Sequence, residues 1–235
     1  AQTSGLPSGS LFPQGTSTVT YSATDASGNA TPCSFTITVQ DMQAPVITCP
    51  SNLTVAADSG MCSAVVNYNT PAATDNCSLA SVSLTGGLAS GGTFPLGTTT
   101  ITYTATDSAG NNSTCTFDVI VTDQEAPVLA CSGTVTVPTD SASCSAVVTF
   151  NAPTATDNCS SASVTQTSGL PSGSTFPIGT STIVYTATDS AGNTSTCSFD
   201  IVVADLDAPS MTCPQNISSC TTSIVITAPV ATDVC

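Results

Sequence analysis

Apolar residues alternate with polar ones in short runs along the chain. In residues 35–39, 117–121 and 199–203 every second position is Phe, Ile or Val, and residues 101–105 form a further run of the same kind. An alternation with a period of two places one face of an extended strand on a core and the other face in solvent. Turns rich in Gly and Pro separate these runs, so the pattern predicts an all-β protein built from short strands.

The runs belong to a unit that recurs about every 82 residues. The octapeptide TATDSAGN stands at residues 104–111 and again at 186–193, and a close variant, SATDASGN, stands at 22–29. A tetrapeptide that begins with Phe-Pro and ends with Gly keeps the same period, at residues 12–15, 94–97 and 176–179. Short strands in units of about 80 residues predict tandem immunoglobulin-like β-sandwiches.

The register of the repeat divides the chain into four segments. Residues 43–124 and 125–206 are two complete units, residues 1–42 match the second half of a unit, and residues 207–235 match the first half. These split half-domains would leave apolar strand faces and edges uncovered, so we expect the tail of one copy to complete the head of the next. The alternatives are a window of a longer array and an arbitrarily cut fragment.

The charged residues exclude most enzymatic and nucleic-acid functions. The 235 residues include 15 acidic ones and no Lys, Arg or His, which gives a formal net charge of −15. No imidazole is present for a Ser-His-Asp triad or a metal, and no cationic side chain for phosphate or nucleic acid. No run of about 20 apolar residues predicts insertion into a membrane. An enzyme that uses paired Asp residues is the remaining catalytic option, and the recurrence of the acids in each unit favours an architectural role instead.

Several fixed motifs follow one another in each unit. They read D-x-x-A-P-[VS]-x-[TA]-C, A-T-D-N-C, F-P-x-G, Y-x-A-T-D-x-x-G-N and C-x-F-x-[VI]-x-V, and they cover nearly the whole chain. In this order the motifs resemble the HYR (hyalin repeat) family. The resemblance implies immunoglobulin-like extracellular modules of adhesive, matrix and bacterial surface proteins, without catalytic activity.

The twelve cysteines follow the repeat, with Cys220 and Cys235 six residues early, and in a chain without His or a CxxC pair they predict disulfides and an extracellular location. The first strand of a sandwich starts near the start of the last, which favours the pairs Cys49–Cys115 and Cys131–Cys197. Elimination then leaves Cys62–Cys77, Cys144–Cys159 and Cys220–Cys235. A bond between the first two cysteines of each unit also fits, because the last copy lacks six residues between them.

Cys33 and Cys213 lack a partner of this kind within the chain. Residues 1–42 hold only the fourth cysteine of a unit, and residues 207–235 hold only the first three. We therefore expect Cys33 to bond to another copy, through Cys213 or, in the alternative pairing, through Cys235. A competing arrangement pairs every cysteine internally, through Cys33–Cys49, Cys115–Cys131 and Cys197–Cys213.

Aspartates also recur with the repeat. The linker that enters a domain, the loop after its second strand and its last hairpin lie at one pole of such a sandwich, and each carries an Asp. Calcium prefers oxygen ligands of this kind, and a cation would balance the acids in a chain without Lys or Arg. The expected calcium ligands are Asp41, Asp75, Asp107 and Asn111 at one junction and Asp123, Asp157, Asp189 and Asn193 at the next. The competing interpretation is turn chemistry, in which each Asp caps its own loop.

Sequons for N-glycosylation are frequent, although many arise by chance in a sequence rich in Ser and Thr. Glycans on them would shield strand edges that lack protective Lys residues. The candidate acceptors are Asn29, Asn52, Asn76, Asn111, Asn112, Asn158, Asn193 and Asn216.

The sequence therefore predicts a structural subunit of an extracellular or cell-surface filament, joined head to tail to copies of itself and linked by disulfides. No cofactor is required, calcium is an optional ligand, and glycans are further partners. The alternative is a calcium-rigidified stalk, or an adhesion or sugar-binding segment, of a large surface adhesin.

Overall fold

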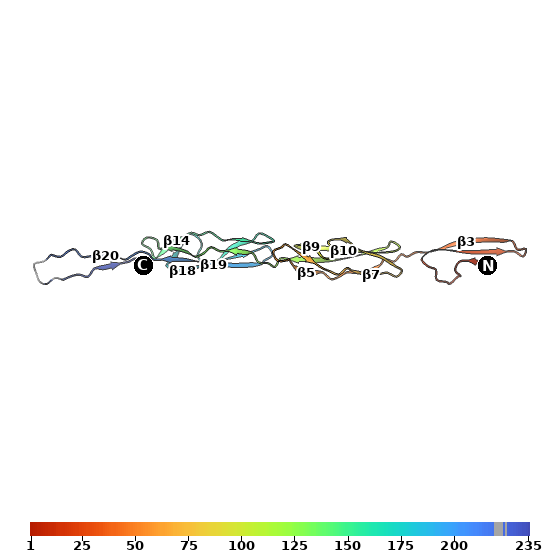
Figure 1. Ribbon diagram of the computed structural model, residues 1–235, viewed down its shortest axis with the longest axis horizontal. Helices are drawn as coiled ribbons and strands as arrows, with labels where there is room; N and C mark the ends of the chain where they lie inside the picture. Colours follow the sequence, from red (N-terminus) through yellow and green to blue (C-terminus); the bar gives the residue numbers. More distant parts are fainter. Residues whose placement is uncertain (219–222, 224) are drawn as a thin grey trace. The chain divides into compact units, whose positions relative to one another are not determined.

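The computed structural model describes residues 1–218, 223 and 225–235, and all regular structure in this part of the chain is β-strand (Figure 1). The all-β prediction is confirmed. None of these described segments forms a helix long and apolar enough to cross a bilayer. The chain divides into two compact units, which we call unit 1 (Ala1–Ala56 with Ser63–Thr122) and unit 2 (Ala57–Cys62 with Asp123–Cys235).

The first complete repeat consists of strands β4 to β11 of unit 1. Its larger sheet has the order β5-β11-β10-β8, in which β5 runs parallel to β11 and the other neighbours are antiparallel. The strand pairs β4–β7 and β6–β9 pack against this sheet and close a sandwich. The bounds are β4 (Val46–Thr48), β5 (Leu53–Ala56), β6 (Ser63–Val66), β7 (Ala72–Thr74), β8 (Leu79–Gly86), β9 (Gly92–Pro95), β10 (Gly97–Asp107) and β11 (Asn112–Thr122).

The second complete repeat, strands β12 to β19 of unit 2, has the same topology. Its larger sheet has the order β13-β19-β18-β16, with β13 parallel to β19, and the pairs β12–β15 and β14–β17 complete it. The bounds are β12 (Val128–Ala130), β13 (Val135–Pro138), β14 (Ser145–Val148), β15 (Thr154–Thr156), β16 (Ser163–Ser168), β17 (Ser174–Pro177), β18 (Gly179–Thr188) and β19 (Thr194–Ala204). The predicted tandem of immunoglobulin-like sandwiches is therefore confirmed.

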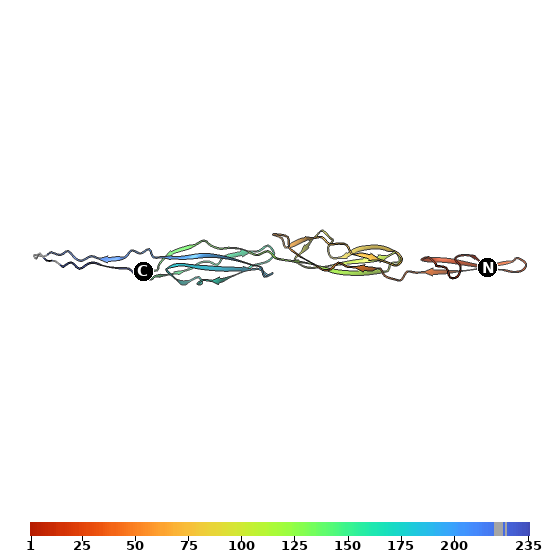
Figure 2. The ribbon, with the colours of Figure 1, turned by 90° about the horizontal axis from the view of Figure 1, so that it is seen from below.

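Two partial repeats flank these sandwiches in the sequence. At the N-terminal end, β1 (Gln2–Ser4), β2 (Gly15–Thr24) and β3 (Ala30–Val39) form a sheet of order β1-β2-β3 (Figure 1 and Figure 2). Near the C-terminus, β20 (Ser210–Thr212) pairs with β21 (Val230–Thr232), as β12 pairs with β15. We call these segments the back half-repeat (residues 1–42) and the front half-repeat (residues 207–235).

The two cores are filled by the alternating positions that the sequence pattern singled out. Residues on one face of each long hairpin are buried, whereas their Thr- and Ser-rich neighbours face outward, as expected for β-branched sequences on a half-buried sheet. In the first complete repeat these are Ile101, Tyr103, Phe117, Val119 and Val121, and in the second they are Ile183, Tyr185, Phe199, Ile201 and Val203. Phe94 of β9 and Phe176 of β17 complete the two cores.

Candidate metal and disulfide sites

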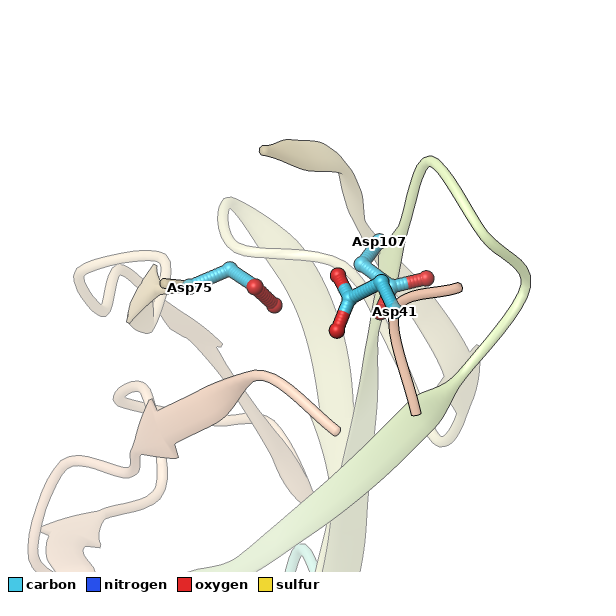
Figure 3. Close-up of side chains that lie close together, drawn as sticks. All are labelled: Asp41, Asp75 and Asp107. Carbon is cyan, nitrogen blue, oxygen red and sulfur yellow. The ribbon is translucent and has the colours of Figure 1, made fainter. Parts of the chain in front are cut away.

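Three aspartates from separate parts of unit 1 meet at one site. Asp41 lies in the linker after β3, Asp75 follows β7, and Asp107 ends β10. One carboxylate oxygen of each lies within 4.8 Å of one from each of the others. Figure 3 shows the side chains of Asp41 and Asp107 side by side, with the Asp75 carboxylate directed toward them.

Turn hydrogen bonds use only part of this oxygen set. Oδ1 of Asp41 accepts the Gln43 backbone N–H at 3.1 Å, and Oδ2 of Asp75 accepts the Cys77 backbone N–H at 3.0 Å. Their second oxygens, Asp41 Oδ2 and Asp75 Oδ1, are buried and have no hydrogen-bond partner. Turn chemistry therefore explains one oxygen of each carboxylate and leaves the other unsatisfied.

Unit 2 contains a second cluster of the same construction, made by Asp123, Asp157 and Asp189. Here Asp123 is only 8% exposed. Asp123 Oδ2 and Asp157 Oδ1 are buried without a partner, although Asp157 Oδ2 accepts the backbone N–H groups of Cys159 and Ser160, each at 2.9 Å. Buried carboxylate oxygens without a hydrogen-bond partner, which we call orphaned oxygens, therefore occur at equivalent positions in both clusters.

The third aspartate of each cluster is fully hydrogen bonded. Asn111 donates to Asp107 through its backbone N–H and through Nδ2, each at 2.8 Å, and Asn193 donates to Asp189 in the same way. Burial acts to raise the pKa of the Asp107 and Asp189 carboxyls, but these hydrogen bonds outweigh it and hold each pKa below its ordinary value. Both aspartates are therefore charged at neutral pH.

The arrangement fits a hard cation. An unpaired buried carboxylate oxygen is costly, and three carboxylates in close contact repel one another. Calcium takes oxygen ligands from carboxylates and backbone carbonyls, and the carboxylate oxygens of either cluster would supply them. Asn111 and Asn193 differ from the expectation for direct ligands, because their Nδ2 groups are turned to Asp107 and Asp189 and position those carboxylates.

Two disulfides join the first and fourth cysteines of the complete repeats. Cys49 bonds to Cys115 with Cα atoms 5.7 Å apart, and Cys131 bonds to Cys197 with Cα atoms 5.8 Å apart. Both distances lie in the ordinary range for a disulfide. Each bond ties the segment next to the first strand to the last strand of its sandwich, as sandwich topology led us to expect.

A third disulfide, between Cys144 and Cys235, replaces the expected Cys144–Cys159 and Cys220–Cys235 pairs. Elimination assumed that every bond stays inside one repeat, whereas this bond joins the second complete repeat to the front half-repeat. Cys62 and Cys77 likewise carry thiols instead of the bond expected between them. Cys220 lies outside the described residues.

The remaining thiols occupy distinct surroundings. Cys33 and Cys213 are exposed. Burial and the nearby Asp41 carboxylate raise the pKa of Cys77. Burial and the neighbouring Cys62 thiol raise the pKa of Cys159 to about 12, and the charge of Asp123 adds to the effect.

The candidate sequons differ in how their side chains are used. The Nδ2 groups of Asn111 and Asn193 bond to aspartates, that of Asn29 donates to Asp25, and that of Asn158 donates to the Met61 carbonyl. A glycan at Nδ2 would disturb these bonds. The exposed acceptors that we still expect to be modified are Asn52, Asn76, Asn112 and Asn216.

Tandem disulfide-bonded sandwiches with acidic clusters define a class of extracellular repeat protein. The chain belongs to the HYR domain family, whose model matches residues 2–39, 40–121 and 122–203. The family resemblance inferred from the motifs is thus confirmed. Members of this family are structural and adhesive repeats, so the chain is a non-enzymatic extracellular protein.

Two of its relatives are hyalins. Hyalin of Strongylocentrotus purpuratus is 37% identical over 187 residues, which covers 77% of this chain and 15% of that protein. Hyalin of Lytechinus variegatus is 35% identical over 237 residues, which covers 95% of this chain and 42% of that protein. The chain therefore spans less than half the length of these relatives.

Among solved structures, a protocadherin gammaB7 EC3-6 cis-dimer aligns with a TM-score of 0.36 and 17% sequence identity. The alignment covers 86% of this chain and 61% of that chain. This likeness is too weak to define the fold, which rests on the strand topology described above.

Proposed function

We propose that the chain is a structural subunit of an extracellular filament, joined head to tail by completion of a split repeat between neighbouring copies. The observation that supports this proposal is the exposure of Phe35 in strand β3. Its side chain is 49% exposed, whereas its counterparts Phe117 and Phe199 in the complete repeats are 3% and 5% exposed. Covering an apolar strand face of this kind with another segment is favourable.

The proposed occupant of this face is the front half-repeat of a second copy. In each complete repeat, strands of the first half pair with or pack on strands of the second half: β4 contacts β10 and β11, and β5 pairs with β11. The described part of the front half-repeat forms only the pair β20–β21 and leaves Ile226 and Val230 exposed. Each half-repeat therefore offers strands that would cover exposed apolar residues of the other.

A Cys33–Cys213 disulfide would lock this contact covalently. Cys33 lies opposite Tyr21 in its hairpin, as Cys115 lies opposite Tyr103. Cys213 occupies by sequence period the place of Cys49. Because the equivalent cysteines of the complete repeats are bonded, the two exposed thiols are matched in position for a bond between copies.

Electrophoresis and electron microscopy test this proposal. We expect oxidised protein to give filaments and a ladder of linked copies that collapses on reduction. Cys33→Ser should remove the ladder, and Phe35→Asp should remove filaments and ladder together. Thr36→Asp, on the opposite face of the same strand, is the matched control and should leave the filaments and the ladder intact. A single band near 23.2 kDa, with Cys33 linked to Cys49, would contradict the proposal.

A second candidate function, a calcium-stabilised stalk, is favoured by the orphaned buried oxygens of the two aspartate clusters. A cation bound to Asp41, Asp75 and Asp107 would tie the linker after β3 to the sandwich that follows it. A cation bound to the second cluster would likewise tie Asp123, which follows β11, to the sandwich of unit 2. This function is compatible with a filament, since it concerns the segments that enter complete repeats.

Thermal unfolding with calcium and with a chelator tests the second candidate. Saturating calcium at about 100 times Kd should add about 2.7 kcal/mol, which corresponds to a Tm increase of about 5–10 °C. Asp123→Asn combined with Asp41→Asn should abolish the increase. Asp25→Asn, at the equivalent of Asp107 in the back half-repeat, is the matched control and should retain it. An unchanged Tm after chelation would leave turn chemistry as the sole role of these aspartates.

A further inference from the structure

The segment Ala57–Cys62 follows strand β5 of the first complete repeat, yet it belongs to unit 2. The Gly60 backbone N–H donates to the Glu125 carboxylate at 2.7 Å, and Asn158 Nδ2 donates to the Met61 carbonyl at 3.2 Å. These two bonds hold the end of the segment against the loop that carries Asn158.

This contact brings two thiols together. The Cys159 thiol lies beside the Cys62 thiol, and it donates to the carbonyl of Met61, the residue before Cys62, at 3.5 Å. The Cys62 thiol donates to the Asn158 carbonyl at 2.7 Å. Two thiols in direct contact, each fixed by a neighbouring backbone carbonyl, are arranged for bond formation with little movement of the chain.

Cys62 and Cys159 occupy the same positions in their two successive repeats as Cys144 and Cys235 do in theirs. Cys62 and Cys144 are the second cysteines of their sequence repeats. Cys159 and Cys235 are the third cysteines of the repeats that follow. Cys144 Sγ lies 3.0 Å from the carbonyl oxygen of Val234, the residue before its partner, as Cys62 Sγ lies beside Asn158. The later of the two equivalent pairs is a disulfide.

We propose that Cys62 and Cys159 form a disulfide, so that the second cysteine of each repeat bonds to the third cysteine of the next. The competing pair, Cys62–Cys77, is disfavoured because the Cys62 thiol is held at the Asn158 carbonyl, next to Cys159, whereas the Cys77 thiol lies near the Asp41 carboxylate. The proposed bond explains the docking of the Ala57–Cys62 segment and extends the Cys144–Cys235 arrangement through the array.

The oxidation proceeds by thiol–disulfide exchange with a small-molecule or oxidoreductase disulfide. The Cys62 thiolate attacks one sulfur of that oxidant, which forms a mixed disulfide and releases one thiolate. The Cys159 thiolate then attacks the Cys62 sulfur, forms the Cys62–Cys159 bond and releases the second thiolate. Overall, two protein thiols lose two protons and two electrons, and the oxidant is reduced to two thiols.

Disulfide mapping of the full chain tests the proposal. The protein is equilibrated with oxidised glutathione, alkylated in denaturant and digested with chymotrypsin, which cleaves after Tyr68 and Phe150. These cuts separate Cys62 from Cys77 and Cys144 from Cys159, so each pairing gives a different linked peptide. We expect Cys62–Cys159, with Cys144–Cys235 as the internal positive control. A Cys62–Cys77 peptide, or alkylated Cys62 and Cys159 after full oxidation, would overturn the proposal.

A double-mutant cycle on the oxidised protein gives an independent measurement. With the bond present, Cys62→Ser, Cys159→Ser and the double variant should lower the Tm by the same amount, about 5–10 °C. Cys33→Ser is the matched control and should leave the Tm of the unassembled chain unchanged. Two single shifts that add up in the double variant would show that the cysteines act independently, which contradicts a bond between them.

Discussion

The back half-repeat and the complete repeats share one hairpin and differ in what covers it. The β2–β3, β10–β11 and β18–β19 hairpins pair in the same register, with a tyrosine opposite a cysteine in each. Phe35, however, is half exposed, and its counterparts are buried. The alternation of apolar and polar residues therefore determines which face of a strand is suited to a core, and the second layer determines whether that face becomes one.

One apolar residue of the back half-repeat is nevertheless buried. Val19 is 2% exposed, although the described residues form no second sandwich layer on the β1-β2-β3 sheet. Gly5 brings its backbone against Val19, and Gln2 Nε2 donates to the carbonyls of Gly5 and Leu6, at 2.9 and 3.0 Å. The loop after β1 therefore covers Val19 locally, whereas Phe35 remains half exposed.

The largest expected effect of this difference is on the free energy of unfolding of the unassembled chain. Phe199→Ala removes a fully packed ring and should cost about 3–5 kcal/mol. Phe35→Ala removes a half-exposed ring and should cost about 0.5 kcal/mol or less. Urea denaturation of dilute protein measures both values.

Phe117→Ala is the matched control, because Phe117 occupies the same place in the other complete repeat, and it should behave like Phe199→Ala. Equal costs for Phe35→Ala and Phe199→Ala would mean that the back half-repeat is already covered in the dilute chain.

A smaller change in the free energy of unfolding is expected at a tightly packed glycine that the complete repeats and the back half-repeat share. Gly169 has a φ of +90°, and a Cβ there would lie 2.7 Å from the Thr182 carbonyl oxygen. Gly169→Ala should therefore cost about 3 kcal/mol, from backbone strain together with overlap. Gly173 has a φ of +86° and open space around it, so Gly173→Ala should cost only about 1 kcal/mol. Urea denaturation separates the two.

Gly5 extends this test to the back half-repeat. A Cβ at Gly5 would lie 2.7 Å from the Thr18 carbonyl oxygen, as in the complete repeat. We therefore expect Gly5→Ala to displace the loop and expose Val19. Faster amide hydrogen exchange in β2 would detect this exposure. Unchanged exchange would show that the loop after β1 does not cover Val19 through Gly5.

The smallest effect concerns Asp25 in the hairpin turn. Hydrogen bonds from the side chain and backbone of Asn29 lower the Asp25 pKa below 3.8. Because the pKa is lowered in the folded state, the stabilisation is present above the unfolded pKa and is lost as the pH falls through the folded pKa. Asn29→Ala should raise the Asp25 pKa toward 3.8 in an NMR titration. A pKa that does not move would assign the shift to the backbone donors alone.

Much of the fold follows from local sequence signals. The alternation at residues 117–121 and 199–203 identified strands and their buried faces, and the 82-residue period identified equivalent positions. The aspartates that come together in each cluster were also predictable, because sandwich topology places a linker, a loop and a hairpin at the same pole. Their orphaned oxygens depend on side-chain geometry and could not be derived from residue order.

The Cys144–Cys235 bond could not be derived in the same way. Spacing within one unit allows several pairings, and the bond depends on a contact between segments of successive repeats. The sequence did contain one relevant signal, which is that Cys33 has no partner within its own half-repeat. That signal indicated that bonds need not close inside one repeat, but it did not identify which cysteines bond between repeats.

Overlapping disulfides would make the repeats nearly inextensible. With the proposed Cys62–Cys159 bond in place, a pull between Cys49 and Cys235 passes along residues 49–62, crosses to Cys159, returns to Cys144 and crosses to Cys235. An extended residue contributes about 3.5 Å of length, so complete unfolding of both sandwiches would release only the slack of two short stretches. The length of a loaded chain would then be set by its cysteines, whatever the state of its β-sheets.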